Sequence, residues 1–231
     1  MPSRILLIGL MSLTSLALPL TAAQAQQSDS VSMQEDAAPT AAYEQSSYTA
    51  PTKSVTPPSK ELITEAILQE LRNAINTDIV INSVVNQNKK YGDMTQLEIN
   101  DLDQEWRTQR TQDNQPLIAA TLSNPLSSYL TRIQAHSLGL YTEIFVMDAN
   151  GLNVGQSNIT SDYWQGDESK FQKTYPVSGT AIFIDEPELN EDYGNWRIQV
   201  NMAISDGEKA VGAVTVEINL TELQRRQDLG L

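Results

Sequence analysis

The spacing of apolar side chains changes once along the chain, from a helical period to a strand period. Between residues 59 and 87, apolar residues recur three or four positions apart with charged residues between them, which predicts one long helix. Thr95 and Glu98 have the spacing of a capping box and predict the start of a second helix. A third helix is expected within residues 125–139, between a proline and a glycine. We expect the apolar stripes of these helices to face a common core.

The second half of the chain has the period of two that is typical of β-strands. Five segments show this β-type pattern: 141–148, 152–157, 180–184, 196–204 and 214–220. Asn-Gly and Asp-Gly turn signals separate two pairs of these segments, so most of the strands are expected to form antiparallel hairpins. We therefore predict the α+β class: an antiparallel sheet of about five strands, with a long N-terminal helix and further helices packed on it.

Two segments precede this predicted domain. Arg4 is followed by an apolar run and by Ala-Gln-Ala at residues 23–25, which predicts a cleaved secretory signal peptide over residues 1–25. An uncleaved anchor is the alternative, and it lacks a cationic flank after the apolar run. Residues 26–58 contain no Leu, Ile, Phe or Trp and are expected to form a disordered tether. Residues 59–231 then form a single domain, which we expect in a bacterial periplasm.

Composition and charge exclude several classes of function. The chain has no Cys and one His, which rules out disulfides, thiolate chemistry and multi-histidine metal sites. With 15 Lys+Arg against 29 Asp+Glu, the net charge of −14 disfavours nucleic acid and anionic membranes as partners. No G-x-S-x-G motif accompanies His136, so we do not expect an enzyme. A carboxylate pair for glycoside cleavage is the remaining catalytic alternative, for which so short a domain leaves little room.

Three motifs occur in an order that resembles the single-module Cache (PDC) sensor domains, which have a PAS-like sheet. They are IFVMDANGLNV at residues 144–154, TSDYWQGDE at residues 160–168, and DG at 206–207 followed by VGAV at 211–214. The resemblance covers residues 59–223 and implies a small molecule bound against one face of the sheet, under the loops that follow the first hairpin. It also allows a homodimer formed through the N-terminal helices.

The sequence departs from this family in two respects. The chain ends at Leu231, without a second membrane span or an output domain, so we expect a stand-alone domain. The aromatic-arginine-aspartate signature of the amino-acid-binding members is also missing. The identity of the ligand therefore does not follow from the resemblance.

The loop at 160–168 holds the first candidate ligand-binding residues. Tyr163 and Trp164 offer flat apolar walls, and Asp167 offers a carboxylate that can fix an amine or a hydroxyl group. The alternative is structural: Trp164 closes the end of the core, and Asp167 caps the helix that follows.

Two candidates come from the later strands. Arg197 lies on the strand face opposite Trp196 and Ile198, where its guanidinium can grip a carboxylate, unless that face is simply solvated. Asp185 begins the acidic run at residues 185–192. Asp185 is a candidate ligand-binding residue. The run 185–192 as a whole has the several oxygen atoms that a calcium ion needs, but it lacks the spaced ligand pattern of a calcium loop, so we favour a solvated loop.

These observations predict a periplasmic domain that binds a small molecule and presents it to a membrane receptor or sensor kinase. It is expected to need no cofactor and no metal ion. The alternative is a non-catalytic interaction or structural protein that keeps the fold with a degenerate pocket.

Overall fold

A computed structural model of the chain describes residues 56–230. The predicted signal peptide and almost all of the predicted tether lie outside the described residues. Within residues 56–230, every helix is too short or too polar to cross a membrane.

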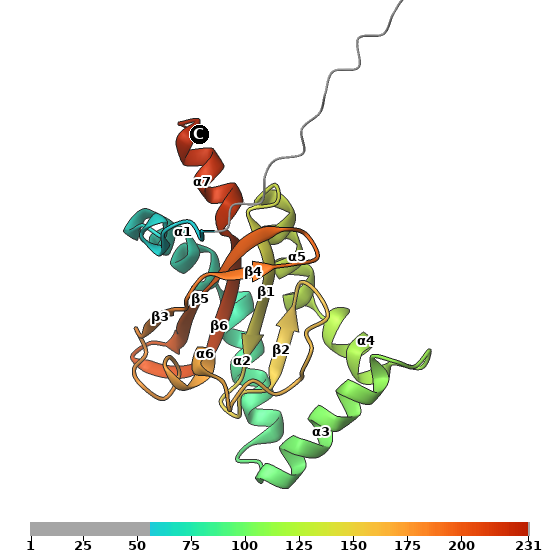
Figure 1. Ribbon diagram of the computed structural model, residues 1–231. Coiled ribbons are helices and arrows are strands. Elements are labelled where there is room, and N and C mark those ends of the chain that lie inside the picture. Colours follow the sequence, from blue (N-terminus) through green and yellow to red (C-terminus); the bar gives the residue numbers. More distant parts are fainter. Residues whose placement is uncertain (1–55, 231) are drawn as a thin grey trace, which may run out of the picture. The chain divides into compact units, whose positions relative to one another are not determined.

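The described residues form one antiparallel sheet, which confirms the predicted α+β class (Figure 1). Its strands are β1 (Tyr141–Met147), β2 (Asn153–Gln156), β3 (Ile182–Ile184), β4 (Glu188–Asn190), β5 (Asn195–Asp206) and β6 (Lys209–Asn219). The strand order is β2-β1-β6-β5-β3, and β4 pairs with β5 beyond this path. Without β4, the strands in chain order give the PAS-like sequence 2-1-5-4-3. The strand β4 itself lies within the acidic run that we expected to be a loop.

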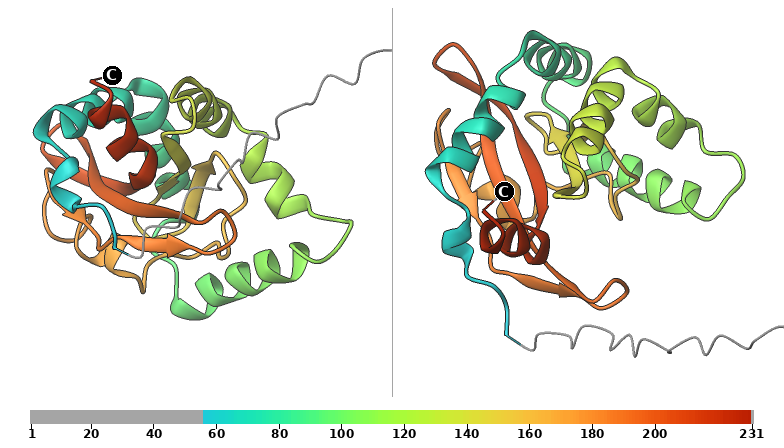
Figure 2. Two further views of the ribbon diagram at one scale, coloured as in Figure 1. Left: turned by 45° about the horizontal axis from the view of Figure 1, so that its top comes forward. Right: turned by 90° about the horizontal axis from the view of Figure 1, so that it is seen from above.

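Helices pack on both sides of this sheet. They are η1 (Lys60–Leu62), α1 (Glu65–Ile75), α2 (Asp78–Tyr91), α3 (Gln96–Gln109), α4 (Pro116–Leu122), α5 (Pro125–His136), α6 (Ser169–Gln172) and α7 (Leu220–Asp228). In Figure 1, α2 lies behind the strands and α6 in front of them. The two views of Figure 2 show α3 and α4 as an arm beside the sheet. Periodicity did not single out α4 or α7.

The helical segment expected at 59–87 is present as two main helices instead of one. Asn76 ends α1 with ψ 62°, and Thr77 precedes α2 in an extended conformation. Asparagine and threonine are weak helix formers but good helix caps, because their side chains compete for backbone hydrogen bonds. The break leaves a corner between α1 and α2 beside the edge of the sheet (Figure 2).

The main core lies between the sheet and the helices α1, α2 and α5. It consists almost entirely of aliphatic side chains, for example Leu71, Val84 and Leu130 from the helices and Ile198 and Val216 from the strands. These residues alternate along each strand with residues that face the other side of the sheet. We call the two sides the helix face and the loop face.

A second, smaller core joins α3 and α4 to the segment that follows β2. Trp106 stacks on Tyr163 with a ring-centroid separation of 5.2 Å, and its Nε1 donates a hydrogen bond to the carbonyl oxygen of Thr160 at 3.0 Å. Asp103 Oδ1 accepts the backbone N–H groups of Tyr163 and Trp164 at 2.9 and 3.0 Å. These contacts hold the segment 160–165 in place.

Candidate functional site

Strand register brings two carboxylates together on the loop face. Glu143 of β1 lies opposite Glu217 of β6, which in turn lies opposite Gln199 of β5. The register shifts between Tyr141 and Glu143, so Thr142 forms a bulge. Tyr141 then packs in the main core, while Glu143 turns to the loop face. Without the bulge, Glu143 would lie on the same face as Tyr141; with it, the carboxylate lies on the loop face.

Glu217 is the centre of a small polar network. Its carboxylate, on a residue that is 6% exposed, accepts a hydrogen bond from the Thr142 hydroxyl at 2.7 Å and pairs with Arg197 Nη1 at 3.2 Å. The Nε atom of Arg197 is buried and has no hydrogen-bond partner among the described residues. Buried donors normally have a partner, so the N–H group at this atom is a donor that a bound molecule can use.

Glu143 is a carboxyl group in an unfavourable setting. Burial, followed by the nearby charge of Glu217, raises its pKa to about 7 from 4.5, although Lys170 and Arg197 act in the opposite direction. At neutral pH this group is therefore partly protonated. A cation placed beside it would favour the ionised form.

The short helix α6 supplies a second cation to the loop face. Lys170 Nζ pairs with Glu168 at 2.9 Å and lies 5.4 Å from the centre of the Phe145 ring. Its side chain is only 13% exposed. Together with Arg197, this lysine faces an excess of carboxylates at the end of β5 nearest to β4.

Two cavities meet at the Arg197–Glu217 pair. One, of about 460 Å³, runs between the start of β1 and the turn that follows β4, and Glu143, Asn158 and Tyr193 also line it. The other, of about 150 Å³, lies under α6 and includes Lys170 and Asp185. The larger volume falls within the range of small-molecule sites, about 300–1,000 Å³.

The middle of the loop face is filled by the protein's own side chains. Phe145, Met147 and Phe171 are buried there, with Tyr175 stacked on Phe171 at 5.2 Å. The space for a ligand is therefore not central but displaced toward β4.

The structure does not bring the five sequence candidates into one cavity. Arg197 and Asp185 line the 150 Å³ cavity. Tyr163 is 2% exposed in the second core, and the half-buried Trp164 donates from Nε1 to the carbonyl of Asn150 at 2.9 Å. Asp167 is exposed, and the residue at the N-cap of α6 is its neighbour Glu168, without a capping side-chain bond.

The loop motif nevertheless has a structural role. Gly151 has a φ of 80°, and a Cβ atom at this position would lie 2.6 Å from the Cα of Gly166. Only a glycine permits this close approach between the first hairpin turn and the loop. The motif thus seats the loop on the sheet, which positions α6 over the loop face.

Sequence reasoning missed three residues of this site: Glu143, Glu217 and Lys170. A signal was present for the first two, because each is a carboxylate inside an otherwise β-forming and largely apolar run, YTEIFVM and VTVEIN. Buried carboxylates in such positions are uncommon unless they have partners. Among residues 56–230, no three His, Cys, Asp or Glu side chains are arranged to hold a metal ion.

A scan against protein-family models finds no match, and neither does a search of curated proteins. Among solved structures, the chain is similar to the sensory domain of the Campylobacter jejuni chemoreceptor Tlp3, with 16% identity, a TM-score of 0.36 and coverage of 70% of this chain. It spans 64% of that domain.

Two further solved structures show a similar degree of likeness. The ligand-binding domain of the Pseudomonas aeruginosa amino acid chemoreceptor PctC, in complex with GABA, has 12% identity and a TM-score of 0.32, over 71% of this chain and 67% of that one. That of the Pseudomonas fluorescens chemoreceptor CtaA, in complex with L-serine, has 17% identity and a TM-score of 0.33, over 55% and 60%. The structural neighbours are thus ligand-binding sensory domains. Because these TM-scores are below 0.5, we assign the α+β class from the strand order and the helices of this chain itself.

Proposed function

We propose that this domain binds a small molecule in the cavities beside Arg197 and Glu217, and presents it to a chemoreceptor or sensor kinase in the membrane. The observation that carries the proposal is the meeting of Arg197, Glu217 and Glu143 at a cavity of about 460 Å³. Convergent charged groups around a preformed cavity are typical of ligand sites.

The charges around the cavities select the chemistry of the ligand. The smaller cavity has five carboxylates, Glu168, Asp185, Glu186, Glu188 and Glu217, against the cations Lys170 and Arg197. Glu143 adds another carboxylate in the larger cavity. A ligand with an ammonium group compensates this excess, and a carboxylate on the same molecule could bind Arg197.

A thermal-shift screen tests the proposal, with amines, amino acids, carboxylates, nucleobases and divalent cations as probes. A ligand at a hundred times its dissociation constant stabilises the native state by about 2.7 kcal/mol. For a domain of this size, the melting temperature then rises by roughly 5–10 °C. GABA and L-serine are the first amino acids to try, because each carries both charged groups.

Matched variants show whether a hit binds at this site. Arg197→Gln and Glu143→Gln should each weaken the shift. Arg225→Gln serves as the control, because Arg225 forms an exposed ion pair with Glu222 on α7 and lines neither cavity. If the ligand raises the melting temperature equally in all three variants, it binds at another site and contradicts the proposal.

The aromatic filling of the loop face favours a second candidate function. If Phe145 and Phe171 occupy the place of a ligand, the domain acts through its surface as an interaction protein. A flat thermal-shift result over the whole panel supports this candidate and contradicts the first one.

The predicted signal peptide supports a periplasmic location. Cell fractionation with antibody detection measures the location, and mass spectrometry of the purified protein measures its N-terminus. The expected result is a periplasmic protein that begins at Gln26. A cytoplasmic protein with an intact N-terminus would contradict the proposal.

A further inference from the structure

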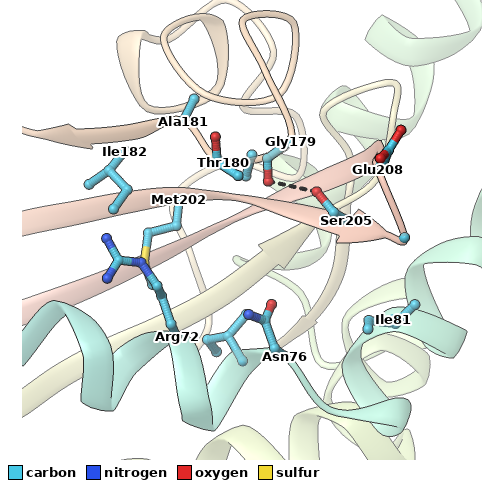
Figure 3. Close-up of a pocket in the computed structure, with 13 residues that line it drawn as sticks. Arg72, Asn76, Ile81, Gly179, Thr180, Ala181, Ile182, Met202, Ser205 and Glu208 are labelled. Atoms are coloured by element: carbon cyan, nitrogen blue, oxygen red, sulfur yellow. Dashed lines mark hydrogen bonds between the residues drawn. The ribbon is translucent and has the colours of Figure 1, made fainter.

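A separate cavity of about 840 Å³ lies at the corner between α1 and α2. Figure 3 shows β5 along it, with the helix corner on one side and the segment 179–182 on the other. The corner is open because α1 and α2 separate at Asn76 and Thr77. Neither Arg197 nor Glu217 lines this cavity. It is therefore distinct from the site on the loop face.

Much of the lining of this cavity is apolar. Ile75 and Met202 line it although each is only 3% exposed, so the cavity reaches down to the main core. Ile81, Ala181 and Ile182 continue the apolar wall around them. Such a wall suits an aliphatic or aromatic body, because the burial of apolar area drives the binding.

Arg72 gives this apolar cavity a cationic end. Its side chain extends from α1 toward Met202 and Ile182 (Figure 3). Nη1 contacts Glu65 at 2.6 Å and Gln69 at 3.4 Å, and both contacts use this one nitrogen. Glu65 is 73% exposed, so the pair contributes little to stability and can be exchanged for another carboxylate.

Glu208 disfavours a second negative charge on a molecule bound in this cavity. This residue lies on the turn between β5 and β6, at the opposite side of the cavity from Arg72 (Figure 3). A second anionic group near that turn would be repelled by it. The lining therefore favours a molecule with one anionic end and an uncharged body.

We propose that this cavity binds an amphipathic monocarboxylate. Its apolar body packs on Ile75 and Met202, and its carboxylate takes the place of Glu65 on the guanidinium of Arg72. Such a ligand would join the α1–α2 corner to the edge of the sheet at β3.

Three eight-carbon probes separate the contributions of charge and apolar body: octanoate, octanol and octylammonium. We expect octanoate to raise the melting temperature and to bind in isothermal titration calorimetry. Octanol should bind more weakly, and octylammonium should give no shift. Equal binding of octanoate and octylammonium would contradict the role of Arg72.

Two pairs of variants locate the octanoate site. Arg72→Gln should weaken binding about tenfold or more, because it removes a charge-assisted hydrogen bond, whereas Arg225→Gln should not. Ala181→Phe fills the cavity and should abolish binding, whereas Ala120→Phe, on the exposed side of α4, should leave it unchanged. Circular dichroism and melting curves without ligand verify that each variant is folded. Arg72 lies on a helix surface, so its variant keeps the test valid if Ala181→Phe does not fold.

Arg197→Gln separates this site from the loop face. Octanoate binding should persist in that variant even if every ligand of the loop face is lost. Loss of octanoate binding in Arg197→Gln, its persistence in both Arg72→Gln and Ala181→Phe, or no binding of octanoate to the native chain would each overturn the proposal.

Discussion

The two faces of the sheet are built from the same strands and do different things. On the helix face, Ile198, Val200 and Val216 are at most 1% exposed and pack in the main core. On the loop face, their neighbours Arg197, Gln199 and Glu217 lie at cavities. The comparison shows that one residue of offset along a strand separates a side chain that holds the fold together from one that can recognise a ligand.

The cost of polarity also differs between the faces. A charged group on the helix face would be buried without a partner and would cost several kcal/mol. The loop face tolerates Glu143, Glu217 and Arg197 because they lie near one another, at cavities, and beside polar groups such as the Thr142 hydroxyl. The loop face therefore carries groups that can bind a ligand at positions where apolar side chains would stabilise the fold more, as binding sites generally do.

The largest expected effect compares adjacent residues on the two faces. Ile198→Ala should lower the free energy of unfolding by about 2–5 kcal/mol, because it leaves a cavity in the main core. Gln199→Ala should change it by about 0.5 kcal/mol or less. Urea denaturation of both variants measures the difference. Similar losses in the two variants would show that the faces do not differ in the way proposed here.

The next effect concerns the pH dependence of the loop face. Because the pKa of Glu143 is about 7 in the folded chain, against 4.5 when unperturbed, the folded state holds this proton more tightly than the unfolded state. The contribution of Glu143 to stability therefore falls as the pH rises from about 4.5 to about 7, and stays low above that.

Glu143→Gln removes this dependence. The variant should be more stable than the native chain at pH 8 by about 1–3 kcal/mol, and nearly equal to it at pH 4. Urea denaturation of both proteins across this pH range measures the difference. A constant difference at every pH would mean that Glu143 keeps an ordinary pKa.

The smallest expected effect sharpens the role of the bulge at Thr142. Thr142→Val keeps the shape of the side chain but removes the hydrogen bond from its hydroxyl to Glu217. The loss should be about 1 kcal/mol in the free energy of unfolding, measured by thermal denaturation. Thr131→Val is a control, because the Thr131 hydroxyl bonds only to its own helix, at the carbonyl of Ser127.

Local patterns in the sequence predicted most of the elements. The alternation around Arg197 and Ile198 correctly separates the two faces of β5, and the Asn-Gly and Asp-Gly signals lie at the hairpin turns. The sequence does contain a signal for the helix break, because Asn76 and Thr77 are residue types that are common at helix ends. Periodicity alone passed over it, because the apolar stripe continues from α1 into α2.

The candidate site was less accessible from sequence, for a physical reason. Tyr163 and Trp164 have the composition of a ligand pocket, but Trp106 and Asp103, some 60 positions away, draw them into a second core. Aromatic side chains serve both purposes equally well, so composition does not distinguish them.

The sequence by itself determined the period of each segment, the turns between strands, and hence which residues share a face, because these depend on backbone geometry over a few neighbours. Only the tertiary structure decided which face is covered by helices, that Glu143 lies opposite Glu217, and that Phe171 fills the centre of the loop face. Those features depend on register and packing between distant segments, such as Thr142 and Glu217, 75 positions apart, or Asn88 and Val211, 123 positions apart, and no local pattern encodes them.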